Sequence, residues 1–216
     1  MDTLTTKSLA ARVSWKGAIS ELDEFGRRRG AAVLLEVLSS EGVQCVFGNP
    51  GTTELPLLDA LIDAPAIRYI LALQEASVVA MADGYAQAAH RPGFVNLHTA
   101  GGLEHGFGSL WNASVSGTPL VVTAAQQDSR HTLTDPLLFG DLVGMATPIV
   151  KWAREITHAD QIPVLIRPAF HYFNAPPTGP VFLSLPMDMM EEIHHRIYVR
   201  TCPDRAKRLY PGSRFC

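Results

Sequence analysis

Short apolar runs alternate with segments of helical periodicity along most of the chain. The runs are five or six residues long and rich in Val, Leu, Ile and Phe, as buried strands of parallel sheets are. The predicted strands are residues 43–47, 69–73, 94–98, 119–124, 149–153 and 181–185. The predicted helices are residues 31–38, 55–62, 76–86, 107–115, 142–145 and 160–173. This alternation predicts one doubly wound α/β domain, with a mostly parallel sheet of about six strands and helices on both faces.

Two of these helices carry a detailed prediction about their inward faces. In the helix 55–62, the apolar spacing turns four side chains toward the core: Leu55, Leu58, Leu61 and Ile62. In the helix 107–115, Leu110 and Trp111 belong to the apolar face. The small residues of the helix 76–86 predict close packing against the sheet.

The helix 160–173 contains an unfavourable residue. Asp160 is expected to cap this helix. Pro168 lies in its interior, where proline removes a backbone donor and costs about 3 kcal/mol. We therefore expect either a kink at Arg167 or a damaging change at Pro168.

The chain divides into three parts. Residues 1–29 mix Thr, Ser and charged residues with scattered apolar ones, and we assign this arm no function. Residues 30–190 form the α/β domain. Residues 191–216 are basic and show little periodicity, as a solvated tail does. A linker cut short and the product of an altered reading frame are the alternatives.

Composition restricts the class of protein. Hydrophobic residues make up 47% of the 216 residues and charged residues 18%, which suits a globular core. The formal net charge of −3 gives no reason to expect nucleic acid or a membrane as partner. The three cysteines, Cys45, Cys202 and Cys216, form no ligand cluster and favour a reducing cytoplasm. No apolar run approaches the length of a membrane span, and we identify no metal site.

Two titratable residues lie at or just beyond the carboxyl ends of predicted strands. Glu75 lies where a strand becomes a helix, at the edge where open α/β sheets bind ligands. The alternative is that Glu75 only favours the positive end of the helix dipole. His98 ends the strand 94–98, and its side chain suits either a structural role or proton transfer near neutral pH. His131 lies in a polar segment and is interpreted as a solvated loop residue.

Two glycine-containing segments follow strands. The turn 48–51 leads into a helix that Thr52 or Thr53 can cap. It lacks both the GxGxxG and the GxxxxGK[ST] spacing, which argues against phosphate binding. Gly101 and Gly102 are expected to open a loop that lets the backbone approach a ligand closely.

Four motifs occur in an order that resembles a known family. They are Phe47–Glu54, Leu71–Ala76, Ala82–Ala86 and Asn96–His98. Together they resemble the N-terminal, pyrimidine-binding domain of thiamine diphosphate-dependent decarboxylases and synthases, and within that family most closely the benzoylformate decarboxylases. The resemblance covers about residues 30–190.

The resemblance implies roles for individual residues. Glu75 would hydrogen-bond N1′ of the cofactor's aminopyrimidine and favour the tautomer that removes the C2 proton. His98 would transfer protons around the intermediate and contact the substrate. Thr52 would contact the substrate carboxylate, where benzoylformate decarboxylases have a serine. Residues of the cofactor pocket would be Asn49, Pro50, Gly51 and, more weakly, Gln126.

The resemblance also implies partners that this sequence does not contain. In the family, Mg²⁺ and the diphosphate are held by a Gly-Asp-Gly motif and an asparagine on another domain, and neither arrangement occurs here. The expected partners are therefore the diphosphate-binding domain of a second subunit, in a homo-oligomer, and a small 2-keto acid. The segment His98–Gly102 favours a decarboxylase, because acetolactate synthases carry a Ser-Gly-Pro-Gly type of turn there. A catalytically dead fragment, a non-catalytic partner of a complete subunit and an acetolactate synthase-like carboligase are the alternatives.

Overall fold

The computed structural model describes residues 27–195 and residue 199, and its centre is a six-stranded sheet. All neighbouring strands run parallel, in the order β3-β2-β4-β5-β7-β6. The strands are β2 (Cys45–Gly48), β3 (Arg68–Leu71), β4 (Gly93–Leu97), β5 (Leu120–Gln126), β6 (Ala153–Glu155) and β7 (Val181–Pro186). The predicted fold class is confirmed.

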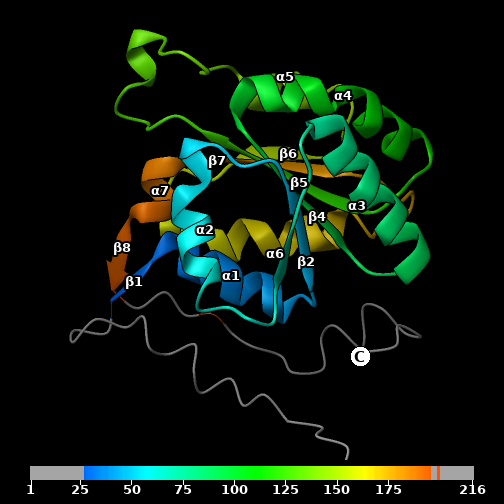
Figure 1. Cartoon of the computed structure of the whole chain (residues 1–216), viewed down its shortest axis with the longest axis horizontal. Helices are drawn as coiled ribbons and strands as arrows, with labels where there is room; N and C mark the ends of the chain where they lie inside the picture. The colour runs from blue at the N-terminus through cyan, green and yellow to red at the C-terminus, as the bar shows by residue number, and fades with distance from the viewer. Residues whose placement is uncertain (1–26, 196–198, 200–216) are drawn as a thin grey trace, which may run out of the picture.

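Helices cover both faces of this sheet (Figure 1). One face carries α1 (Gly30–Ser40), α2 (Leu55–Leu61), α6 (Ile162–Tyr172) and the short α7 (Met187–Glu191). The other face carries α3 (Glu75–Ala89), α4 (Thr99–Val115) and α5 (Leu142–Ala146). Short 3₁₀ turns, η2 (Thr52–Glu54), η3 (Thr132–Thr134) and η4 (Ala159–Gln161), lie in the connections. Each helical layer forms its own apolar core against the sheet, which is how a doubly wound domain buries both faces.

The middle strands are apolar because they are covered on both sides. Every residue of β4, β5 and β7 is buried. In contrast, β3 is an edge strand, and the prediction of a buried strand at 69–73 was wrong. Leu71 is 59% exposed, and Leu73, beyond the strand, is 89% exposed. The prediction failed because an apolar run does not reveal whether its strand has neighbours on both sides.

Several local predictions also need correction. In α2 the buried residues are Pro56, Leu57 and Ala60. Of the four predicted inward residues, Leu58 and Leu61 are half-buried, whereas Leu55 and, just after the helix, Ile62 are exposed. The error arose because apolar residues occur around most of this helix, so the spacing in the sequence did not distinguish the face with Leu57 and Ala60 from the face we chose. In α4, Leu110 is buried as predicted, but Trp111 is 56% exposed.

The start of α4 differs more. This helix begins at Thr99, so Gly101 and Gly102 lie in its first turns and do not form a loop. Thr99 has a φ of 56°, an unusual value for a β-branched residue, at the point where β4 turns into the helix. The glycines misled the prediction because glycine is also a frequent loop residue.

At the other end of the chain, α6 runs unbroken from Ile162 to Tyr172 through Pro168. Pro168 has no N–H to donate to the backbone carbonyl of Val164, four residues earlier in the helix. Val164 is 65% exposed, so this part of the helix faces solvent. Asp160 does not cap α6, because it lies inside η4. The strand predicted at residues 149–153 lies further along the chain, at Ala153–Glu155 (β6). Ile149 and Val150 instead pack against the core after α5.

Two short strands lie outside the sheet and were not predicted. β1 (Arg27–Arg29) pairs antiparallel with β8 (Ile193–His195), beside α1 and α7 (Figure 1). The boundaries at residues 30 and 190 stay predictions. Residues 1–26, 196–198 and 200–216, which hold most of the arm and the basic tail, lie outside the described residues. Across residues 27–195, no helix has the length and apolar character needed to cross a membrane.

The close approach of β2 to its neighbours generates a stability prediction. A Cβ at Gly48 would lie 1.9 Å from Tyr69 Oη and 2.9 Å from the backbone oxygen of Asn96. We expect Gly48→Ala to lower the free energy of unfolding by about 1–3 kcal/mol, as overpacking does. Gly84→Ala is the matched control, because a Cβ at that position in α3 meets no atom within 4 Å. The control should stabilise the chain by up to about 1 kcal/mol, since alanine is the better helix former. Equal effects of the two changes in urea unfolding would contradict this account of β2.

Candidate active site at the switch point of the sheet

The order of the strands reverses direction between β2 and β4. The chain leaves β2 for β3 on one side and later adds β4 on the other side. At such a switch point the connections diverge, and open α/β sheets bind their ligands in the crevice that results. The predicted residues Asn49–Thr52 follow β2, Glu75 lies shortly after β3, and His98 follows β4. The topology therefore gathers most of the predicted site at one edge.

Glu75 is the first residue of α3 and is 7% exposed. The side chain of Gln74 caps this helix by accepting a hydrogen bond from the Ser77 N–H at 3.2 Å. Glu75 therefore lies in the first turn, where the helix dipole favours a negative charge. Its Oε1 accepts a hydrogen bond from Asn49 Nδ2 at 3.0 Å. The structure thus joins two predicted residues that are 26 positions apart in the chain.

Residues of α4 complete the surroundings of this carboxylate. His105 Nδ1 lies 3.5 Å from Glu75 Oε2, although the His105 side chain is 67% exposed. Gly102 faces Glu75 so closely that a Cβ there would come 3.3 Å from Oε1. The second glycine of the pair therefore serves close packing between α3 and α4, which the sequence interpretation did not anticipate. His105 was likewise missed.

His98 lies at the carboxyl end of β4, as predicted, and belongs to a second hydrogen-bonded group. Its Nδ1 is 2.8 Å from Glu54 Oε2 and 3.1 Å from Thr53 Oγ1. Its ring lies against Gly51, where an added Cβ would fall 2.3 Å from the ring carbon Cε1. Only glycine fits at this position beside the ring.

Glu54 is the main residue that sequence reasoning missed. Its side chain is 1% exposed and accepts a hydrogen bond from the Gly51 N–H at 2.7 Å. An acid three residues after the N-cap that accepts the N-cap N–H is one half of a capping box, and that spacing from Gly51 could have identified Glu54. Burial and, next, the charge of Glu54 raise the pKa of Tyr69 well above its ordinary value, so the Tyr69 hydroxyl stays protonated.

The remaining predicted residues are placed differently. Thr52 is exposed at the start of η2, and Pro50 lies between Asn49 and Gly51. Gln126 is 3% exposed at the end of β5, and its Nε2 donates to the Gly140 carbonyl at 2.7 Å. Its Oε1 accepts from the Gln127 N–H, so its amide is engaged with the backbone. A cofactor role for Gln126 stays a prediction.

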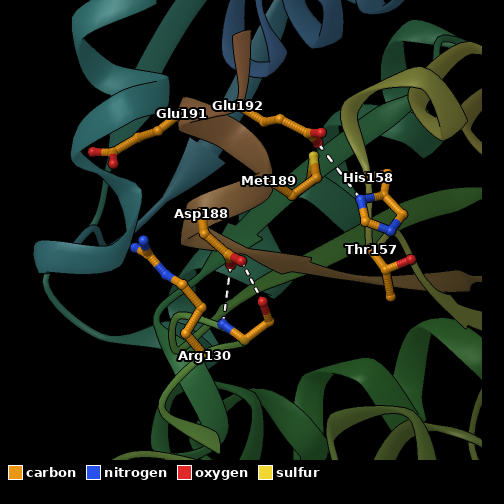
Figure 2. Close-up of a pocket in the computed structure, with 8 residues that line it drawn as sticks. Arg130, Thr157, His158, Asp188, Met189, Glu191 and Glu192 are labelled. Carbon is orange, nitrogen blue, oxygen red and sulfur yellow. Dashed lines mark hydrogen bonds and ion pairs between the residues drawn. The ribbon is translucent and has the colours of Figure 1, made fainter. Parts of the chain in front are cut away.

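A cavity of about 380 Å³ lies elsewhere, and no predicted site residue lines it. It lies beyond the carboxyl ends of β5 and β7, where Asp188 accepts hydrogen bonds from the backbone and hydroxyl of Ser129 (Figure 2). Arg130 binds Asp128, and this hydrogen bond lowers the pKa of Asp128 to about 2. The polar groups of this cavity are thus largely paired with one another. Neighbouring His131 is exposed in the loop, as predicted.

Glu192 closes the same cavity from the side of β8. Burial would raise its pKa, but the N–H of Ala159 and the rings of His194 and His158 outweigh burial and keep the pKa below its usual value. Figure 2 shows His158 facing Glu192 across the cavity. In the part of the chain that the structure describes, no group of three or more His, Cys, Asp or Glu is arranged to bind a metal.

Known proteins are similar to this chain in sequence and in fold. The family described as "Thiamine pyrophosphate enzyme, N-terminal TPP binding domain" matches residues 28–145, more than half of the chain. Benzoylformate decarboxylase from Pseudomonas aeruginosa is 44% identical over 155 residues, which are 71% of this chain and 29% of that protein. The acetolactate synthase large subunit of Haemophilus influenzae is 31% identical over 159 residues, which are 74% of this chain and 28% of that protein.

A solved structure agrees with these relatives. The thiamine diphosphate-dependent 4-hydroxybenzoylformate decarboxylase of Rhodococcus jostii RHA1 superposes with a TM-score of 0.72 at 35% identity, covering 87% of this chain and 34% of that one. The chain thus spans about a third or less of the length of these proteins. From the family match, the shared fold and the glutamate placed at the switch point, we conclude that the chain belongs to the thiamine diphosphate-dependent enzymes and contains their N-terminal cofactor-binding domain.

Proposed function

We propose that this chain supplies the pyrimidine-binding half of the active site of a thiamine diphosphate-dependent 2-keto acid decarboxylase. The observation that carries the proposal is the position of Glu75, a nearly buried carboxylate at the switch point with Asn49 as its hydrogen-bond donor. The identity of 44% to a benzoylformate decarboxylase supports the decarboxylase class. A reducing cytoplasm is the proposed location, in keeping with the free thiol of Cys45.

The residues at the switch point fit the pyrimidine end of the cofactor. A carboxylate can share a proton with a ring nitrogen, and Gly102 keeps the space beside Glu75 Oε1 free of a side chain. When bound, thiamine diphosphate supplies an electron sink for the electrons released when carbon dioxide leaves a 2-keto acid. Glu75 would hold the proton at N1′ of the pyrimidine, and Asn49 would orient its carboxylate.

The second group at the switch point suits the substrate. His98 lies next to the turn that carries Thr52, and an imidazole ring can both donate and accept a proton. The exposed hydroxyl of Thr52 would bind the carboxylate of the keto acid. His98 also favours a decarboxylase over an acetolactate synthase-like carboligase, which stays the second candidate because acetolactate synthases are about 30% identical.

The proposed partner is the diphosphate-binding domain of a second subunit, which would bring Mg²⁺ and form a homo-oligomer. Exposed apolar residues at the end of β3, just after it, and on α3 and α4 support this: Leu71, Leu73, Met81, Trp111 and Val115. Exposed apolar side chains are what a binding site for another protein requires when they gather in one patch. A dead fragment would expose the same surface but would show no activity with any partner.

The first prediction concerns the acid. In a chimera where this chain replaces the matching part of the Pseudomonas aeruginosa enzyme, Glu75→Gln should slow exchange of the cofactor's C2 proton about 100-fold or more. The loss is expected because the amide cannot supply a proton to N1′. Glu104→Gln, at an exposed position of α4, is the control and should keep the exchange rate. Exchange at the unmodified rate in the Glu75 variant would remove Glu75 from the mechanism.

The second prediction concerns the substrate contact. Thr52→Ala should raise KM for 2-keto acids about 10- to 100-fold, because it removes a hydrogen bond of about 1.5–3 kcal/mol to a charged group. Thr52→Ser keeps the hydroxyl and should keep activity, with better use of bulky substrates. Alanine and serine variants with the same kinetics across a series of keto acids would mean that Thr52 does not touch the substrate.

The third prediction concerns the chain by itself. It should bind thiamine diphosphate weakly and turn over no keto acid, because the residues that hold the diphosphate and Mg²⁺ are proposed to lie on the partner. Its exposed apolar surface should promote self-association. Calorimetric titration with thiamine diphosphate and Mg²⁺, followed by a decarboxylation assay, measures this. Micromolar binding with turnover would refute the proposed division of the site between two domains.

A further inference from the structure

Three groups at the switch point lie within hydrogen-bond distance of the buried carboxylate of Glu54. The Gly51 N–H donates to Oε2 at 2.7 Å, and the Thr53 hydroxyl donates to Oε1 at 2.9 Å. His98 Nδ1 lies 2.8 Å from the same Oε2 that accepts from Gly51. Because the side chain of Glu54 is only 1% exposed, water contributes little to this arrangement.

These contacts decide which ring nitrogen of His98 carries the proton. Both oxygens of Glu54 already accept from other groups, so the carboxylate acts as an acceptor and has no proton to offer. Thr53 also has its hydroxyl proton committed to Glu54, which leaves only lone pairs facing Nδ1 at 3.1 Å. Nδ1 is thus surrounded by acceptors and must be the donor. The other nitrogen, Nε2, has no hydrogen-bond partner among the described residues, and the ring is 24% exposed.

We propose that Glu54 is a positioning residue that holds His98 with its proton on Nδ1, so that Nε2 is the atom that exchanges protons. In water a free imidazole ring carries its proton on either nitrogen, and the partner of one nitrogen sets the state of the other. When Nε2 accepts a proton, a new N–H bond forms there and the ring becomes a cation. The Glu54 carboxylate balances that charge without moving, and the proton later leaves from the same Nε2.

Gly51 contributes to the positioning of both Glu54 and His98. The ring can reach Glu54 only because Gly51 has no side chain, since a Cβ would lie 2.3–2.5 Å from three ring atoms. The Gly51 N–H also keeps one Glu54 oxygen in place. The inference depends on the proposed function only in the identity of the group that exchanges protons with Nε2. The placement of the proton on the ring is independent of it.

The test measures the tautomer of His98 directly in the full chain, without cofactor or substrate. Long-range proton–nitrogen NMR correlations of a chain labelled with [¹⁵N]histidine distinguish a protonated from an unprotonated ring nitrogen at alkaline pH. The His98 signals are assigned by their loss in His98→Asn. In the unmodified chain we expect a protonated Nδ1 and an unprotonated Nε2. The exposed His131 provides an internal reference that should not change between variants.

Two substitutions separate positioning from mere turn stabilisation. Glu54→Ala removes the acceptor, and the ring should then move its proton largely to Nε2. Glu54→Gln should keep the proton on Nδ1, because the Gly51 N–H requires the amide oxygen, not the NH₂ group, at the position of Oε2. A purely structural role for Glu54 predicts the same tautomer in all three proteins.

A proton on Nε2 in the unmodified chain or in Glu54→Gln overturns the inference, and so does a proton kept on Nδ1 in a folded Glu54→Ala. The first two spectra decide the question even where the alanine variant does not fold. They also separate this inference from the proposed function. If His98 has the expected tautomer but the chimera is inactive, the role of Glu54 is supported and the proposed decarboxylase function is refuted.

Discussion

The backbone at the end of β2 and in the turn that follows lies very close to neighbouring elements, and the carboxyl edge of the sheet depends on this constraint. The backbone of Gly48 lies against the hydroxyl of Tyr69, and the backbone of Gly51 lies against the ring of His98. At both positions a methyl group would overlap with atoms of adjacent elements. Without these two glycines, the turn could not bring residues of β2, β3 and β4 to one place. The geometry of the site thus requires glycine, which has no side chain, at both positions.

The same turn places two carboxylates in different surroundings. Glu75 begins a helix and has an amide donor from Asn49, with an exposed histidine near its second oxygen. Glu54 is buried, and its three donors leave neither oxygen free. A buried charge is tolerated only when hydrogen bonds replace the lost water, and here each carboxylate has such partners. One carboxylate is accordingly suited to meet a ligand, and the other is suited to hold a side chain that does.

The edge position of β3 connects the fold with the proposed assembly. Because β3 has a strand on one side only, the segment that leads to Glu75 stays partly exposed. The helices α3 and α4 pack against each other and against the sheet, and the exposed apolar side chains Met81 and Trp111 lie on their outer sides. A site divided between two domains needs such an open face next to its carboxylate, since a fully enclosed Glu75 could not meet a cofactor held by a partner.

The sequence by itself determined the alternation of strands and helices, and with it the doubly wound fold. It also determined the places of Glu75 and His98 after their strands, because strand ends are marked by local patterns. It did not reveal that β3 is an edge strand, since an apolar run reads the same with one neighbour or two. Nor did it reveal the start of α4 at Thr99, where a left-handed residue and two glycines resemble a loop.

Only the tertiary structure decided which residues act together. Glu54 and His98 are 44 positions apart, and their contact exists because β4 is added beside β2 and not beside β3. Asn49 and Glu75 meet for a similar reason, across the turn from β2 and the start of α3. Hydrophobic periodicity reports on burial along one element, whereas the pairing of polar groups depends on the order in which the elements assemble.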